Sequence, residues 1–323
     1  MMTASIRSVL GLGLTVFALA APSAIGQATA AATSIRFTTG RSALKIPIEI
    51  DNNLILIRMS FNGKRPIRLI FDTGASMTAL RVVRAAEFGI KGTVQASGNA
   101  TGGRIEGQIA RGVSLSVPGV EVSPQPVGIF PFPQVPGFDF DGVVGYHFIN
   151  QFVVEIDYLK KVMNLYDRRS YRYRGKGAVV PLILKNRETP LVSTGFLFTN
   201  GQRNSAMVEL DTGGDSAFVL RFPFVNKHAL LKTSKDLTES GGRGAGGEQE
   251  RLLGRAKTAK LGPFVFRDVP VLFSLQKEAN DPGVDGIVGG EILRRFKLII
   301  DYSRSRMILE PNKDLRSPIE VEG

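Results

Sequence analysis

Two aspartates in this chain occur in the same short pattern. Asp72 and Asp211 each begin an Asp-Thr-Gly tripeptide that follows a strand-like run. A second repeated motif, Asp-Gly-β-branched-Val-Gly, follows at residues 141–145 and 285–289. One Asp-Thr-Gly arises by chance in roughly one chain of this length in ten to twenty, but two copies in register with a second motif do not. The pattern predicts an internal duplication with one carboxylate in each half.

A pair of carboxylates held close together has a definite chemistry. Ionisation of both carboxylates at this distance has a high free-energy cost, so the pair shares one proton. The ionised member takes a proton from water, and the protonated member donates one to a carbonyl oxygen. The two apparent pKa values belong to the pair and not to Asp72 or Asp211 alone. This chemistry uses no metal and no cofactor, and we expect neither.

The residues after each aspartate suit this arrangement. Thr73 and Thr212 are expected to brace the two loops by hydrogen bonds across a pseudo-twofold axis. Gly74 and Gly213 are expected to let the backbone pass close to the carboxylates, because glycine has no Cβ.

The composition excludes several other chemistries. The 323 residues include no Cys, which excludes disulfides, thiol nucleophiles and thiolate metal sites. The two histidines, His147 and His228, lie near no nucleophile-elbow pattern and are interpreted as structural. The length allows two domains, and 36 Gly with 17 Pro favour a turn-rich β protein.

The N-terminal residues 1–30 are typical of a secretory signal peptide. Arg7 is their one charged residue, and residues 9–21 are apolar or small, with small-residue cleavage sites after them. The alternative is an uncleaved membrane anchor, but the apolar run is short and contains Gly and Pro. We therefore expect a periplasmic or secreted protein. Removal of this segment lowers the formal net charge from +12 to +11, which favours adhesion to anionic surfaces without defining a partner.

The elements that position the aspartates are indicated by turn signals. Residues 54–61 and 66–71 read as a hairpin around Asn62-Gly63, which places Asp72 at the end of a buried strand. Residues 191–198 and 205–210 repeat this hairpin around Asn200-Gly201. The other elements expected are helices at 78–88, 146–152 and 291–296, strands at 110–117, 127–130 and 265–273, glycine-rich tips at 97–103 and 240–247, and closing hairpins from 153 and from 298.

The domain limits follow from this repeat, whose period is near 140 residues. We expect an N-terminal lobe at 34–167, an inter-lobe linker at 168–177, a C-terminal lobe at 178–313 and a loose tail at 314–323. The linker is rich in Arg and Tyr. It is interpreted as an inter-lobe strand or a solvated linker in preference to a nucleic-acid patch.

Residues 45–311 resemble the aspartic proteases of the pepsin and retropepsin group, through both Asp-Thr-Gly motifs and the two segments at 141–145 and 285–289. The resemblance implies a mainly β, two-lobed acid protease fold with a cleft between the lobes. It also implies that Asp72 and Asp211 activate a water that attacks a peptide carbonyl. Pepsins carry Ser or Thr directly after Asp-Thr-Gly, whereas this chain has Ala75 and Gly214. The loss of that hydrogen bond predicts activity at a milder pH than pepsin's.

Other residues are candidates for substrate binding. The two tips are interpreted as flaps that bind an extended peptide through Gly102, Gly103, Gly246 and Gly247; the alternative is a pair of mobile surface hairpins. Asp215 has two open interpretations, because an Asp at this spacing binds substrate backbone in retropepsins but can equally form a buried ion pair. Three aromatic side chains line substrate subsites or only pack within their loop: Phe130, Phe132 and Phe138.

The sequence therefore favours a single-chain aspartic endopeptidase, expected to be a monomer that acts on peptides or proteins and binds no nucleic acid. One alternative is a non-catalytic peptide-binding protein on the same scaffold. Another is a protein that binds anionic surfaces through its positive charge.

Overall fold

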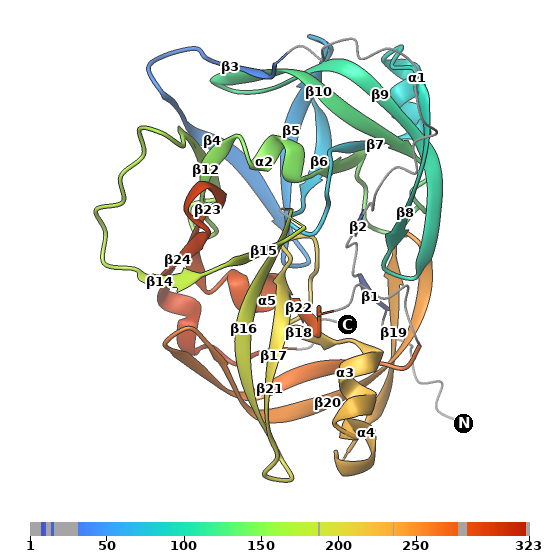
Figure 1. Cartoon of the computed structure of the whole chain (residues 1–323), viewed down its shortest axis with the longest axis vertical. Coiled ribbons are helices and arrows are strands. Elements are labelled where there is room, and N and C mark those ends of the chain that lie inside the picture. The colour runs from blue at the N-terminus through green and yellow to red at the C-terminus, as the bar shows by residue number, and fades with distance from the viewer. Residues whose placement is uncertain are drawn as a thin grey trace.

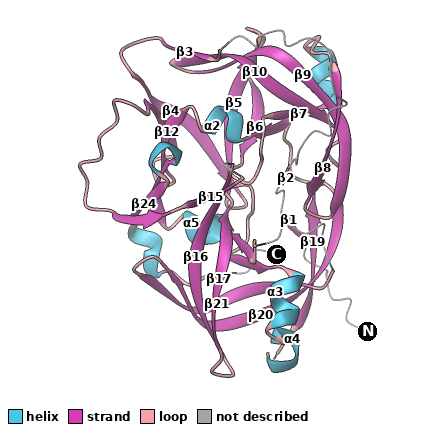
Figure 2. Cartoon of the chain, viewed as in Figure 1, coloured by secondary structure: helices cyan, strands magenta, loops and turns pink. Residues whose placement is uncertain are grey.

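The computed structural model describes residues 8–10, 14–15, 32–186, 188–234, 236–276 and 283–320. Strands form most of these residues, and the helices are few and short (Figure 2). The prediction of a mainly β protein is therefore confirmed. The helices are α1 (Val82–Glu87), α2 (Tyr146–Ile149), α3 (Phe222–Lys227), α4 (Leu230–Thr233) and α5 (Gly290–Leu293), with 3-10 turns η1 (Tyr302–Arg304) and η2 (Lys313–Arg316).

The strands of the described residues belong to two sheets (Figure 1). The larger sheet contains, in spatial order, β14 (Ala178–Pro181), β24 (Arg306–Pro311), β23 (Phe296–Asp301), β12 (Phe152–Asp157), β13 (Val162–Asp167), β4 (Ser42–Asp51), β5 (Leu54–Phe61), β6 (Ile67–Phe71), β11 (Gly142–Val144), β7 (Ala79–Arg81), β10 (Val120–Phe130), β9 (Gly103–Val117), β8 (Val94–Ala100) and β2 (Leu14–Thr15), with β3 (Ser34–Phe37) beside β10. The smaller contains β1 (Ser8–Leu10), β19 (Thr238–Gly244), β20 (Gly247–Leu261), β21 (Phe264–Ser274), β18 (Phe218–Leu220), β22 (Gly286–Val288), β17 (Arg203–Leu210), β16 (Thr189–Phe198) and β15 (Ile183–Lys185).

The same pairings surround both aspartates. Strands β6 and β17, which end just before Asp72 and Asp211, pair in parallel with β11 and β22. The second motif fixes this contact, because Asp141 accepts a hydrogen bond from the amide of Arg68, and Asp285 accepts one from the amide of Met207. The two halves also meet directly, since β12 pairs with β23 through runs that are apolar on both faces.

Several elements differ from the sequence expectation. The predicted helix at 78–88 is wrong in its first part, because Ala79–Arg81 forms β7 between β10 and β11 and only Val82–Glu87 is helical. Burial of Ala79 and Leu80 in the sheet overrides their helix propensity. The helices expected at 146–152 and 291–296 are shorter, since Phe152 and Phe296 already begin strands.

The C-terminal segment was expected to be loose, but residues 314–320 are held in place. The fully buried guanidinium of Arg295 donates hydrogen bonds to the carbonyl oxygens of Asp314, Ser317 and Pro318 at 2.7–2.9 Å. Ile319 is buried against the core.

Most of the expected signal peptide at 1–30, namely residues 1–7, 11–13 and 16–30, lies outside the described residues. Its short strands β1 and β2 pair with β19 and β8. Within the part of the chain that the structure describes, no helix has the length and apolarity needed to cross a membrane.

Candidate active site

Asp72 and Asp211 lie face to face, although 138 residues separate them in the sequence. Each follows a strand, and each main-chain amide donates to the parallel partner strand, to Val144 at 3.0 Å and to Val288 at 3.1 Å. A Cβ on Gly213 would lie 2.4 Å from Cγ of Asp72, and one on Gly74 would lie 3.1 Å from Cγ of Asp211. The two glycines therefore allow each carboxyl to approach the opposite loop.

Two threonines join the loops that carry these aspartates. Thr73 Oγ1 donates to the carbonyl oxygen of Leu210 at 2.5 Å and accepts from the amide of Thr212 at 3.0 Å. Thr212 Oγ1 donates to the carbonyl oxygen of Phe71 at 2.7 Å and accepts from the amide of Thr73 at 3.1 Å. All these groups are buried, so the reciprocal bonds hold the two halves in one geometry.

Main-chain amides support both carboxyls. Asp72 Oδ1 accepts from Gly74 at 2.8 Å and from Ala75 at 3.1 Å, and Asp211 Oδ1 accepts from Gly213 at 2.8 Å. Within the described residues, Oδ2 of Asp72 is buried and receives no hydrogen bond from an N–H or hydroxyl group. The neighbouring carboxyl of Asp211 is one cause of the raised pKa of Asp72.

The electrostatic surroundings of the pair are unequal. Burial and then the charge of Asp211 raise the pKa of Asp72 well above its usual range. Burial also raises the pKa of Asp211, but the amide of Gly213, the bond to Asp72 and the charge of Arg221 oppose this rise. These surroundings favour a proton on Asp72 more than on Asp211.

Glu209 and Arg221 are residues near the pair that the sequence analysis missed. Arg221 donates to Glu209 at 3.0 Å, and Glu209 is only 3% exposed. The charge of Glu209 contributes to the raised pKa of Asp72. The sequence contained one indication of this role, because Glu209 is an acidic residue within the otherwise apolar run before Asp211.

The two glycine-rich tips pack against each other (Figure 1). The amide of Gly246 donates to the carbonyl oxygen of Thr101 at 2.9 Å. Gly102, with φ of +95°, and Gly103, with φ of +150°, lie against the main chain of Gly247 and Gly246. A Cβ on Gly102 would come within 2.2 Å of the Gly247 carbonyl oxygen, so this contact requires glycine.

Asp215 is held by three hydrogen bonds. Its main-chain oxygen accepts from the side-chain amide of Asn53 at 3.0 Å and from the main-chain amide of Glu291 at 3.2 Å. Its carboxyl accepts from the hydroxyl of Ser216. Asp215 is buried beside the tripeptide loop.

Four phenylalanines form an aromatic cluster beside Asp72. Consecutive ring centroids are 5.7–6.2 Å apart. They pack with Ile70, Ala75 and Ile105, and with Ala245 of the opposite tip. The cluster consists of Phe130, Phe132, Phe138 and Phe140.

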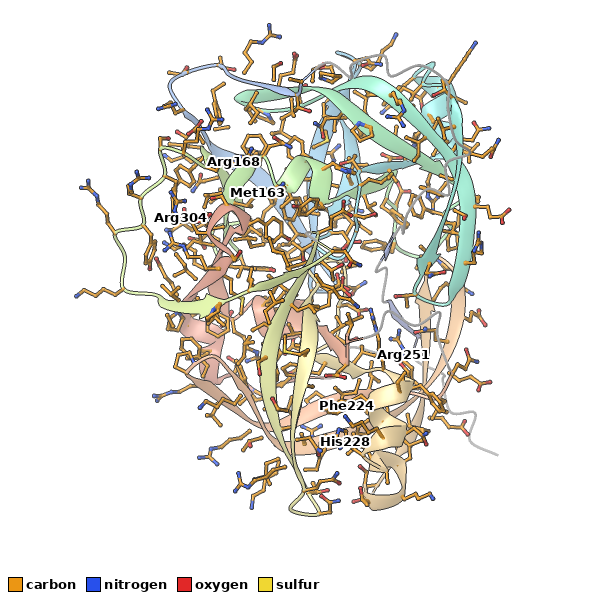
Figure 3. All side chains as sticks on the ribbon, in the orientation of Figure 1. Met163, Arg168, Phe224, His228, Arg251 and Arg304 are labelled. Carbon is orange, nitrogen blue, oxygen red and sulfur yellow. The ribbon has the colours of Figure 1, made fainter. Side chains whose placement is uncertain are left out.

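Both histidines lie outside the aspartate site. His228 contacts the ring of Phe224 at 4.4 Å and bonds with Asn204 at 2.8 Å (Figure 3). Burial lowers the pKa of His147, which keeps this ring neutral.

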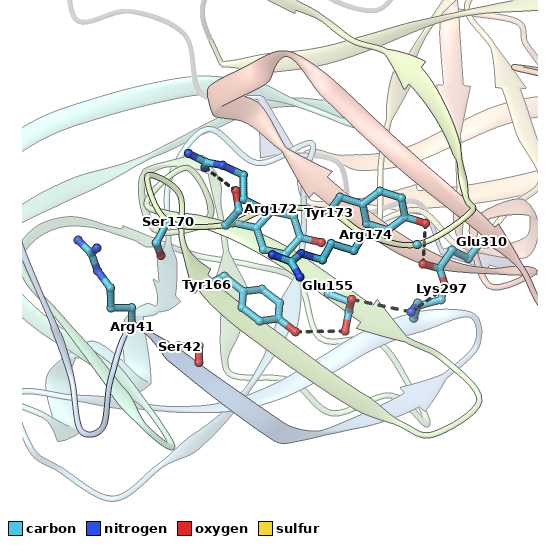
Figure 4. Close-up of a pocket in the computed structure, with 12 residues that line it drawn as sticks. Arg41, Ser42, Glu155, Tyr166, Ser170, Arg172, Tyr173, Arg174, Lys297 and Glu310 are labelled. Atoms are coloured by element: carbon cyan, nitrogen blue, oxygen red, sulfur yellow. Dashed lines mark hydrogen bonds and ion pairs between the residues drawn. The ribbon is translucent and has the colours of Figure 1, made fainter.

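The segment at 168–177 contains no strand, contrary to one of its two interpretations. It borders a separate pocket of about 500 Å³ (Figure 4). Tyr171 and Tyr173 pack against the apolar residues of β12, β23 and β24, and the Tyr173 hydroxyl donates to Glu310 at 2.7 Å. Part of each tyrosine ring is therefore buried against this apolar cluster.

Residues 57–148 match the model of the aspartyl protease family. The match contains Asp72 and the first of the two Asp-Gly-β-branched-Val-Gly motifs, and it supports a protease function in general terms. The mainly β fold is consistent with this family. A search of curated proteins finds no match. No group of three or more His, Cys, Asp or Glu side chains in the described residues is arranged to hold a metal ion.

Proposed function

We propose that this protein is an aspartic endopeptidase in which Asp72 and Asp211 form the catalytic pair. The observation that carries this proposal is the face-to-face arrangement of the two buried carboxyls, held by the reciprocal Thr73 and Thr212 bonds. Buried carboxyls that share a proton are unfavourable for stability and are characteristic of catalytic sites.

The unequal surroundings assign the roles in peptide hydrolysis. Asp211, ionised, takes a proton from the attacking water while Asp72 donates its proton to the carbonyl oxygen, which gives a tetrahedral diol. Asp72 then takes a proton back from a diol hydroxyl, and Asp211 passes its proton to the leaving nitrogen. The peptide bond breaks, and the pair returns to its starting state.

We further propose that the tips act as flaps in a two-lobed enzyme, with lobes at 34–167 and 178–313. An extended peptide would bind under Gly102, Gly103, Gly246 and Gly247, and the tip contact must open to admit it. In this structure β2 pairs with the edge of β8, and β1 pairs with the edge of β19. Both edges therefore accept an added strand, and an extended peptide would pair with them in the same way. Export by the signal peptide at 1–30 remains part of this proposal.

Cleavage of a mixed peptide library between pH 3 and 7 tests the function. Asp72→Asn and Asp211→Asn are each expected to lower kcat/KM by about 10²–10⁴-fold, and a statine-type transition-state mimic should inhibit the native enzyme. Cleavage that persists in both variants would overturn the proposal. Peptide binding without cleavage by the native protein would instead support the non-catalytic alternative.

A further inference from the structure

The segment that joins the two halves carries a concentrated positive charge. Residues 168–176, which we call the basic strap, contain no acidic residue and five basic ones: Arg168, Arg169, Arg172, Arg174 and Lys176. All but the first are exposed, and none of the five forms an ion pair with a carboxylate in the described part of the chain. By contrast, the nearby Arg304 and Arg306 both pair with Asp301, at 3.0 and 3.1 Å. The charges of the basic strap are therefore free to bind an anionic partner.

The basic strap is held in place although it contains no strand. The hydroxyl of Tyr173 donates to Glu310 at 2.7 Å and accepts from the amide of Gly177 at 2.6 Å. The guanidinium of Arg304 donates to the main-chain oxygens of Arg168, at 3.3 Å, and Tyr171, at 3.4 Å (Figure 3). Because these contacts order the main chain beforehand, a partner would bind the strap without the full entropic cost of ordering it.

Two exposed aliphatic side chains lie on the same face of the larger sheet as the strap tyrosines. Val179 of β14 is 54% exposed and stands opposite Ile308, a residue on which these tyrosines pack. Leu44 of β4 is 56% exposed and follows two residues after Ser42, which pairs with Tyr166 on this face. Strands β4 and β14 end the row β4, β13, β12, β23, β24, β14, so the two aliphatic side chains flank the face at its two edges (Figure 1).

The pocket beside the strap also suits an anion. Its volume is about 500 Å³, and its wall contains Arg172 and Arg174 (Figure 4). The two acidic residues of the wall already have a cation near them, because Lys297 lies 2.7 Å from Glu310 and 3.9 Å from Glu155. Arginine binds phosphate through charge-assisted hydrogen bonds, and the volume is large enough for a lipid headgroup.

The aromatic residues distinguish between two kinds of anionic partner. Single-stranded nucleic acid binds most strongly where aromatic rings are free to stack on bases. Here the rings of Tyr171 and Tyr173 pack partly against the apolar cluster beneath them, so they offer little free surface. A lipid surface instead requires exposed cations for its headgroups and exposed aliphatic side chains for its interface. This face has both.

We propose that this face docks onto a membrane surface that contains anionic phospholipids. The basic strap binds the headgroup phosphates, and Leu44 and Val179 enter the interface on either side of it. None of the candidate active-site residues takes part in this docking, so the inference does not depend on the proposed protease function.

Co-sedimentation of the full chain with vesicles tests the charged part of this surface. The vesicles consist of phosphatidylcholine alone or with about one-third phosphatidylglycerol. The double variant Arg174→Gln, Lys176→Gln should bind the anionic vesicles about 10–30-fold more weakly than the native protein. Neither side chain makes a hydrogen bond or ion pair in the described residues, so the fold should be retained. The matched control is Lys64→Gln with Arg111→Gln, which removes the same charge at exposed positions outside the strap.

A second pair of variants tests the aliphatic part. Leu44→Ser with Val179→Ser should weaken binding to the anionic vesicles by about 5–20-fold, because less apolar surface leaves water. Val83→Ser with Val265→Ser is the control, since these valines are 66% and 54% exposed but lie on α1 and β21. All variants keep residues 1–30, so any binding by that segment is common to every measurement.

Several outcomes would overturn the inference. Native protein that binds the two kinds of vesicle equally, or a strap variant that binds as well as the native protein, would show that the strap does not dock on anionic lipid. An equal loss in the Lys64 and Arg111 control would assign the binding to net charge and not to this face. Undiminished binding of the Leu44 and Val179 variant would contradict the proposed orientation. Tighter binding to a single-stranded oligonucleotide than to the vesicles, at the same salt concentration, would replace the lipid with nucleic acid.

Discussion

Burial raises the pKa of both Asp72 and Asp211, but their neighbours act in opposite directions. Asp72 experiences the charges of Asp211 and Glu209, whereas Asp211 has the opposing influence of Arg221. The symmetry of the two tripeptides is therefore broken by a few side chains around them. This difference is the basis for the distinct roles that we propose for the two carboxyls.

The first prediction concerns the pH dependence of activity. The active state carries one proton on the pair, so activity falls at low pH when the pair gains a second proton and at high pH when it loses its one proton. Because both pKa values are raised, kcat/KM should remain high at milder pH than pepsin's. Glu209→Gln should lower the upper apparent pKa, since the charge of Glu209 helps to raise it. Maximal cleavage only at strongly acidic pH would contradict this.

The second prediction concerns stability. The raised pKa of Asp72 means that the folded protein retains a proton which the unfolded chain releases. This contribution is fully present below the unfolded pKa and decreases as pH rises through the folded pKa. Asp72→Asn should therefore be more stable than the native protein at neutral pH, by about 1–3 kcal/mol, with less difference at pH 3. Urea unfolding at several pH values measures it, and equal stability of the two proteins at every pH would refute it.

At the scale of elements, the site depends on hydrogen bonds between segments far apart in the chain. The threonine bonds connect the ends of β6 and β17, and the tip contact connects the β8–β9 hairpin with the β19–β20 hairpin. The first set joins the loops that carry the two carboxyls, and the second joins the two tips.

Thr73→Val tests the connection between the strand ends. It removes the donor to Leu210 and the acceptor for the amide of Thr212, which leaves buried polar groups unpaired. The expected loss is about 1–3 kcal/mol in the free energy of unfolding, together with reduced kcat. Thr194→Val is the matched control, because its buried hydroxyl has no hydrogen-bond partner in the described residues. A similar loss in both variants would mean that the hydrogen bonds of Thr73 contribute nothing specific.

Gly102→Ala tests the contact between the tips. The added Cβ meets the carbonyl oxygen of Gly247, so the tips should separate, with faster amide exchange at residues 100–103 and a raised KM. Gly201→Ala serves as the control, since Gly201 also has a positive φ, +87°, but nothing lies within 4 Å of its Cβ position. Unchanged exchange at the tips of Gly102→Ala would contradict the observed packing.

At the scale of the whole molecule, the C-terminal residues 314–320 pack against the second half through Arg295 and Ile319. Arg295 connects them to α5, where Glu291 accepts from the same guanidinium at 2.5 Å. The neighbouring Asn53 donates to Glu291 at 3.2 Å and thus ties the first half to this network.

Arg295→Met is expected to release residues 314–320 and to lower the free energy of unfolding by about 1–3 kcal/mol, because the carbonyl oxygens of this segment and the buried Oε1 of Glu291 lose their donor, while Arg294 still pairs with Glu291 at 2.7 Å. Thermal unfolding and limited proteolysis near the C-terminus measure the effect. Arg316→Met, at an exposed position in the same segment, is the control. If both variants matched the native protein, the segment would not contribute to stability.

The sequence alone determined the features that depend on local chemistry. The Asn-Gly turns of the two hairpins, the strands that end at Asp72 and Asp211, and the mainly β character all follow from residue type and short-range pattern. The two tripeptides also identified which residues to bring together, because their repetition is visible without a structure.

Only the tertiary structure decided the features that depend on contacts over long sequence distances. Ala79 and Leu80 became a strand because β10 and β11 lie on either side of them, and the expected loose tail is fastened by a buried arginine. The tip contact and the Glu209–Arg221 pair also arise from chain segments whose proximity no local pattern encodes. Burial also raises the pKa of Asp72 and of Asp211, and burial is a property of the packed molecule.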